Sequence, residues 1–68
     1  MLDVRGLNCP MPVLMVQREV KAKAPKTLEV LADHMTAVGN ITRFGNAQGY
    51  QVAFKENDDG DFVITLSK

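Results

Sequence analysis

The alternation of apolar and polar residues along the first half of the chain predicts two strands with a helix between them. Alternating residues cover Leu2–Val4 and the stretch TLEVLA, which is Thr27–Ala32. Between these stretches three valines recur at helical spacing, with polar residues mostly on the other side, which predicts a helix over Pro10–Ala24. Pro25 is expected to end this helix, because proline disfavours helical backbone angles at the residue before it.

A second helix is predicted over Thr36–Gln48. Asp33 or Thr36 is expected to cap its first turn, and Gly49 suits the left-handed backbone position just beyond its last turn. Gly39 inside the helix is unfavourable relative to alanine by about 1 kcal/mol. The buried stripe is predicted to consist of Ala37, Val38, Ile41, Phe44 and Ala47.

The remaining chain predicts a hairpin, with strands over Tyr50–Lys55 and Asp61–Leu66 joined by the turn ENDDG. Each strand-helix-strand unit implies parallel pairing through a right-handed crossover, which places both helices on one face of the sheet. The closing hairpin adds an antiparallel strand. The predicted fold class is therefore α/β, a two-layer β-α-β-α-β-β sandwich with a mixed four-stranded sheet, in a single domain over residues 1–68.

Composition narrows the possible functions and the compartment. Eight basic and eight acidic side chains give a net charge of zero, whereas nucleic-acid binders usually carry an excess of positive charge. Nucleic acid is therefore an unlikely partner. The amino-terminal MLDVRG does not resemble a signal peptide, and no apolar run is long enough for a membrane span. A lone cysteine fits a reducing, cytoplasmic setting, and neither a metal site nor a cofactor is predicted.

The only cysteine, Cys9, lies between the first predicted strand and the first predicted helix. Open α/β sheets usually place their sites in such loops, at the carboxyl ends of the strands. Pro10 suits the first helical position and Pro12 the same turn, because the missing N–H groups there have no partner within the helix. The Cys9 sulfur would then face the positive end of the helix dipole and could accept the Met11 N–H, which would lower the thiol pKa. The alternative is that Cys9 is a small buried hydrophobic residue.

The stretch LDVRGLNCPMPVL resembles the amino-terminal signature of the TusA/SirA/YedF family of small sulfur-handling proteins. The resemblance continues through LEVLADHMTAVGNITRFGNAQGYQV and is closest to the YedF-like branch. It implies the fold predicted above and a sulfurtransferase that carries a persulfide on Cys9. The sulfur would come from a donor such as a cysteine desulfurase and would pass to an acceptor protein. The signature residues are Asp3, Arg5, Gly6, Cys9, Pro10 and Pro12.

Several polar residues are candidate neighbours of the thiol. His34 follows the second predicted strand, and parallel pairing would place it at the same sheet edge as Cys9, where it could influence thiol ionisation. The alternative is a solvated loop histidine. Arg5 either offsets the charge of the thiolate or pairs with a carboxylate such as Asp3 or Asp33. Asp3 is expected to hold the loop through backbone hydrogen bonds.

Two functions remain open from the sequence. The first is the sulfur carrier, which suits a chain with no second cysteine to discharge a persulfide as a disulfide. The second is a regulatory interaction module that uses the same fold without turnover and senses oxidants through the thiol.

Overall fold

The computed structural model describes residues 2–8 and 11–68, so the predictions for Cys9 and Pro10 fall outside the described residues. The order of helices and strands is the predicted one, and each boundary lies within one residue of the prediction. The elements are β1 (Leu2–Asp3), α1 (Met11–Lys23), β2 (Thr27–Ala32), α2 (Met35–Ala47), β3 (Gln51–Glu56) and β4 (Phe62–Ser67).

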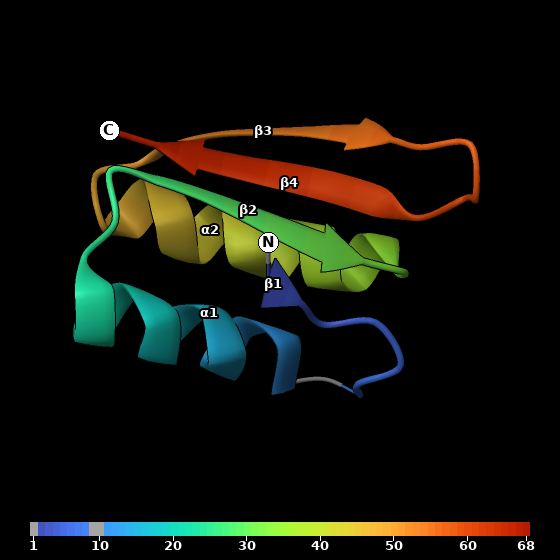
Figure 1. Ribbon diagram of the computed structural model, residues 1–68, viewed down its shortest axis with the longest axis horizontal. Helices are drawn as coiled ribbons and strands as arrows, with labels where there is room; N and C mark the ends of the chain where they lie inside the picture. The colour runs from blue at the N-terminus through green and yellow to red at the C-terminus, as the bar shows by residue number, and fades with distance from the viewer. Residues whose placement is uncertain (1, 9–10) are drawn as a thin grey trace.

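The four strands form one mixed sheet in the order β1-β2-β4-β3 (Figure 1). β1 pairs with β2 in parallel, and β4 pairs antiparallel with both β2 and β3. The second strand-helix-strand unit was predicted to pair its two strands directly, and that prediction is wrong, because β4 lies between them. Its helix-facing side chains Ile64 and Leu66 are fully buried, whereas most of β3 is exposed. The more apolar strand of the hairpin therefore takes the central position.

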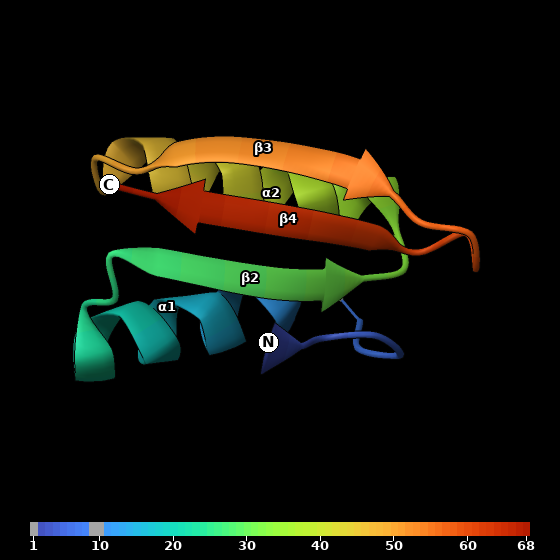
Figure 2. The same cartoon turned by 45° about the horizontal axis from the view of Figure 1, so that its top comes forward.

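Both helices cover the same face of the sheet, as predicted (Figure 2). Side chains alternate between the two faces of each strand, so one set faces the helices and the other faces outward. On β2 the helix-facing set is Leu28, Val30 and Ala32, which are all buried. Together with residues of both helices and of β4 they form a single hydrophobic core.

Helix α1 packs through the predicted valine stripe, since Val16 and Val20 are buried, as is Pro12 in its first turn. Helix α1 ends at Lys23, two residues before Pro25, which was predicted to end it. The Ala24 N–H donates to the Val20 carbonyl at 2.8 Å, and Ala24 then adopts a φ of 43°. This left-handed conformation is unfavourable for a residue with a side chain, and it turns the chain from the helix toward β2.

The cap of helix α2 differs from the prediction. The N-cap residue is His34, and its side chain makes no capping hydrogen bond. Thr36 lies inside the first turn, and the Asp33 carboxylate instead accepts the Gly6 N–H at 3.0 Å. Neither predicted cap is used, because Asp33 holds the loop that follows β1. Beyond the carboxyl end of the helix, Gly49 has the predicted left-handed conformation, with a φ of 88°.

The buried stripe of α2 also needs one correction. Ala47 is exposed, and Phe44 is only partly buried. Gly45 is buried in their place, where the helix approaches β3 and β4 closely. A Cβ atom on Gly45 would lie 2.6 Å from Val52 Cγ2 and 2.9 Å from Leu66 Cδ2. Only a glycine therefore allows this approach of helix to sheet without movement of the neighbouring side chains.

Candidate functional site

The loop after β1 lies at the end of the molecule where both helices begin (Figure 1). Parallel pairing of β1 with β2 brings the carboxyl ends of these strands to one edge, and each strand is followed by the amino terminus of a helix. The antiparallel strand β4 begins at the same edge, since Phe62 pairs with Ala32. This edge is where the sequence places the candidate site.

Arg5 fixes the loop through two carboxylates. Its Nε and Nη2 donate to the two carboxylate oxygens of Asp3, each at 3.0 Å, and its Nη1 donates to Asp61 at 3.2 Å. The Arg5 backbone N–H also donates to Asp3 Oδ1 at 3.0 Å, as expected for a residue that holds the loop. Asp61 was not foreseen, because nothing in the sequence marks it as a neighbour of a residue near the amino terminus.

Asp33 holds the next residue of the loop. Its Oδ2 accepts the Gly6 N–H at 3.0 Å, so Asp33 pairs with the loop backbone and not with the Arg5 side chain. Gly6 has a φ of 76°, in the left-handed region that favours glycine, which explains why the signature has a glycine here. His34 Nε2 lies 3.9 Å from Asp33 Oδ1, and its side chain is 70% exposed.

The first turn of α1 begins immediately after the undescribed pair Cys9 and Pro10. The Met11 N–H donates to the Asn8 carbonyl at 2.8 Å. This donor therefore has a backbone acceptor, and the expected bond from Met11 to the Cys9 sulfur falls outside the described residues. Pro12 lies in the first turn, as predicted, and is buried there. Because Pro12 has no N–H and the Met11 N–H is engaged, neither position offers a free amide donor.

A pocket of about 220 Å³ lies beside this loop. Residues on both sides of the undescribed pair line it, together with the first turns of the two helices. His34 is among them, so it lies beside the loop residues Leu7 and Asn8, and its influence on the Cys9 thiol stays a prediction. The described lining contains no Asp, Glu, Lys or Arg; it consists of Leu7, Asn8, Pro12, Val13, His34, Thr36, Ala37 and Asn40.

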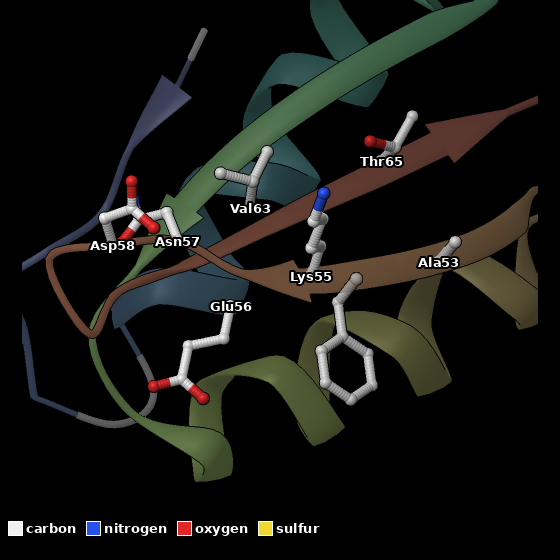
Figure 3. A pocket seen from close by; sticks show the side chains of 8 residues that line it. Ala53, Lys55, Glu56, Asn57, Asp58, Val63 and Thr65 are labelled. Atoms are coloured by element: carbon white, nitrogen blue, oxygen red, sulfur yellow. The ribbon is translucent and has the colours of Figure 1, made fainter.

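A larger hollow of about 500 Å³ lies along the β3–β4 hairpin. Figure 3 shows Lys55, Val63 and Thr65 projecting from the face of the sheet that the helices leave open, whereas Glu56 projects to the other side. None of the residues that the sequence nominates lines this hollow. Its size therefore does not make it the candidate site.

The Asp3–Arg5 pair determines the clearest pKa shifts at this edge. Hydrogen bonds from the Arg5 side chain, and then from the Arg5 backbone, hold the pKa of Asp3 below its ordinary value. The pKa of Arg5 is raised, first by its hydrogen bonds to Asp3 and then by those to Asp61. Both side chains are about half exposed, so solvent screens the interaction and its contribution to stability is modest.

We expect this pair to weaken in acid. The folded-state pKa of Asp3 is lowered, so the stabilisation is present above the unfolded pKa, about 4, and is lost as pH falls below it. Titration of the Asp3 carboxyl by carbon-13 NMR should give a midpoint below the ordinary aspartate value. In Arg5→Met the midpoint should return to that value. An Asp3 midpoint that is the same in both proteins would contradict this assignment.

Metal ligands and membrane spans were sought among residues 2–8 and 11–68. No group of three or more His, Cys, Asp or Glu side chains there could hold a metal ion. No helix in the same range is long and apolar enough to cross a membrane.

Comparison with known proteins identifies the family. The family described as "Sulfurtransferase TusA" matches residues 1–68, and the chain belongs to it. A putative sulfur carrier protein of Methanocaldococcus jannaschii is 37% identical over 98% of this chain and 91% of its own. The sulfur carrier protein TusA of Pseudomonas putida is 34% identical over 98% of this chain and 85% of its own. A crystal structure of a SirA-like protein from Desulfitobacterium hafniense superposes with a TM-score of 0.85 at 25% identity, covering 96% of this chain and 90% of that one.

These findings confirm the predicted α/β fold and the resemblance to the TusA and SirA proteins. They confirm the predicted function at the level of a sulfur carrier, a class that works between a sulfur donor and a sulfur acceptor. The placement in the YedF-like branch stays a prediction, as do the roles of the individual site residues.

Proposed function

We propose that Cys9 accepts a sulfane sulfur as a persulfide and passes it to an acceptor protein. The observation that carries this proposal is the anchored loop at the shared edge of the sheet. Asp33 and the Arg5 ion pairs hold the residues just before Cys9, and helix α1 begins at Met11, just after Pro10. Such a frame holds the backbone on both sides of one thiol, so its sulfur would be presented in a constant position.

The chemistry proceeds by two exchanges at sulfur. The Cys9 thiolate attacks the sulfane sulfur of a donor persulfide, and the donor cysteine leaves as a thiolate. An acceptor thiolate then attacks the outer sulfur of the Cys9 persulfide, and the Cys9 thiolate is released. No net oxidation or reduction occurs, so no cofactor is required. Because the chain has a single cysteine, the persulfide cannot be lost to an intramolecular disulfide.

The described residues support particular roles around the sulfur. Arg5 would balance the charge of the loop only in part, since it already pairs with two carboxylates. The first turn of α1 supplies the positive end of a helix dipole, which favours the thiolate. The engaged Met11 N–H and the missing Pro12 N–H leave few amide donors to compete for it. The thiolate would thus be formed readily without being held too tightly to react.

A cysteine desulfurase is the donor class that we propose, and a reducing cytoplasm is the setting in which the thiol would stay available. Incubation with such a desulfurase and free cysteine should add one sulfur atom to the intact mass of the chain, and dithiothreitol should remove it. Alkylation with iodoacetamide beforehand blocks one defined position, because there is one cysteine, and should prevent the gain.

If no sulfur is gained from the desulfurase or from inorganic polysulfide, the carrier proposal is wrong. A chain that takes no sulfur but gains oxygen from dilute hydrogen peroxide would instead support the redox-sensing module.

A further inference from the structure

The pocket beside the loop has a lining without Asp, Glu, Lys or Arg among its described residues. The apolar lining is supplied by Leu7, Pro12, Val13 and Ala37, and the uncharged amides of Asn8 and Asn40, the Thr36 hydroxyl and the His34 ring supply polar groups. A ligand with a carboxylate or an ammonium group would leave its charge without a partner there, which is unfavourable. An uncharged apolar group fits this lining better.

Two exposed methionines lie in the first turns of the helices that line the pocket. Three large hydrophobic side chains are exposed in the described part of the chain, namely Met11, Met35 and Phe54. Met11 and Met35 are the first residues of α1 and α2, and the first turns of these two helices line the pocket. Methionine is common at surfaces that adapt to a protein partner. The two methionines directly precede lining residues in the sequence, Pro12 in α1 and Thr36 in α2, although they do not line the pocket themselves.

The size of the pocket limits its occupant. A volume of about 220 Å³ is that of roughly seven water molecules, so a leucine, methionine or phenylalanine side chain fits. A tripeptide thiol such as glutathione is larger, and its carboxylates would find no cation in the described lining. The observations therefore favour one side chain of a protein over a free thiol.

We propose that this pocket binds an uncharged apolar side chain that lies next to the reactive cysteine of the sulfur-exchanging partner protein. The inference rests on the proposed function and adds the recognition step. The partner's apolar side chain enters between the first turns of α1 and α2, which brings its cysteine to the loop that carries Cys9. Selectivity for partners would then depend on the residue beside their cysteine.

A panel of cysteine peptides activated as 2-thiopyridyl disulfides tests this directly. The Cys9 thiolate attacks the peptide sulfur, a mixed disulfide forms, and pyridine-2-thione leaves and is followed by its absorbance. The peptides are acetylated and amidated and differ only in the residue before cysteine, which is Leu, Ala, Asp or Lys. We expect the leucine peptide to react about tenfold faster than the alanine peptide, as partial burial of its side chain predicts. The Asp and Lys peptides should react no faster than the alanine peptide.

Three variants test whether the preference for leucine comes from this pocket. Thr36→Asp places a charge at the exposed rim and should reduce the leucine-to-alanine ratio to about one, whereas the isosteric Thr36→Val should keep it. Phe54→Ser removes the exposed hydrophobic side chain on β3 and should leave the ratio unchanged. Because the readout is a ratio, a change in the thiol pKa cancels.

The proposal is overturned by a wild-type ratio near one or by faster reaction of a charged peptide. It is equally overturned if glutathionyl 2-thiopyridyl disulfide reacts faster than the leucine peptide, which would indicate a site for free thiols. A chain that loads sulfur without a leucine preference refutes this inference alone. A chain that shows the preference but takes no sulfur refutes the proposed function alone.

Discussion

Cys9→Ser is expected to abolish sulfur transfer altogether. A serine hydroxyl does not ionise near neutral pH and cannot form a persulfide, so the loading step has no nucleophile and the transfer step has no persulfide for the acceptor thiolate to attack. Transfer from a labelled desulfurase to the chain, and from the chain to an acceptor thiol, should both fall to the rate without protein. The measurement is the intact mass and the radioactivity retained after gel filtration under non-reducing conditions.

A relocated thiol provides the control for this variant. In Cys9→Ser/Ser67→Cys the chain again has one cysteine, now at the end of β4 that pairs with Thr27. That end of the sheet lies opposite the loop, so a thiol there has neither the helix amino terminus nor the anchored backbone. We expect at least tenfold slower loading than in the wild type, because the helix amino terminus that is expected to lower the thiol pKa and the proposed docking pocket are both absent there. Equal loading of the two proteins would show that a thiol away from the loop suffices.

Gly45→Val is expected to give the largest loss of stability among substitutions on the helices. The new Cβ alone would lie 2.6 Å from Val52 Cγ2 and 2.9 Å from Leu66 Cδ2. Val52 is β-branched and stiff, and Leu66 is completely buried, so α2 must move away from the sheet. Overpacking of this kind lowers the free energy of unfolding by about 3 kcal/mol, out of a total of roughly 3–10 kcal/mol for a domain of this size.

Gly39→Val is the matched control in the same helix. Apart from its chain neighbours and the adjoining backbone of its own helix, no heavy atom lies within 4 Å of a Cβ built on Gly39, and the position is exposed. Valine is a slightly better helix former than glycine, so this variant should be unchanged or a few tenths of a kcal/mol more stable. Urea denaturation followed by circular dichroism measures both variants. Equal midpoints for the two variants would contradict the close approach of α2 to the sheet at Gly45.

Local patterns were sufficient to predict every helix and strand of this chain, because each has a clear periodicity and a proline, glycine or turn at its ends. The order of the strands in the sheet could not be predicted from these patterns. A strand-helix-strand pattern is compatible with direct pairing or with a strand inserted between the two, and only the greater burial of β4 decides it. The close approach of α2 to the sheet at Gly45 could not be predicted either. From the sequence alone, a glycine within a helix indicates only a residue with low helix propensity.

Some features of the candidate site could likewise be predicted from the sequence, and others could not. The site loop and the position of His34 at the same end of the sheet follow from the signature and from parallel pairing, whereas the left-handed conformation of Gly6 was seen only in the structure. The residues that form hydrogen bonds and ion pairs with the loop could not be predicted. Arg5 and Asp61 are 56 residues apart in the sequence and meet only because β4 begins at the edge where β1 ends. Asp33 could have capped α2, paired with Arg5 or bound the Gly6 backbone, and its place in the sequence is compatible with all three.

The central position of β4 has a consequence for synthesis on the ribosome. β4 joins β2 to β3 and is the last strand of the domain to leave the exit tunnel. Until then β3 has no hydrogen-bonded neighbour, and β2 is paired only with the two-residue β1. The Lys68 N–H, which donates to the Lys26 carbonyl at 2.8 Å, completes the sheet. Such distant pairing slows folding, so the sheet, and with it the Asp61 anchor of the loop, would form only after the whole domain has been translated.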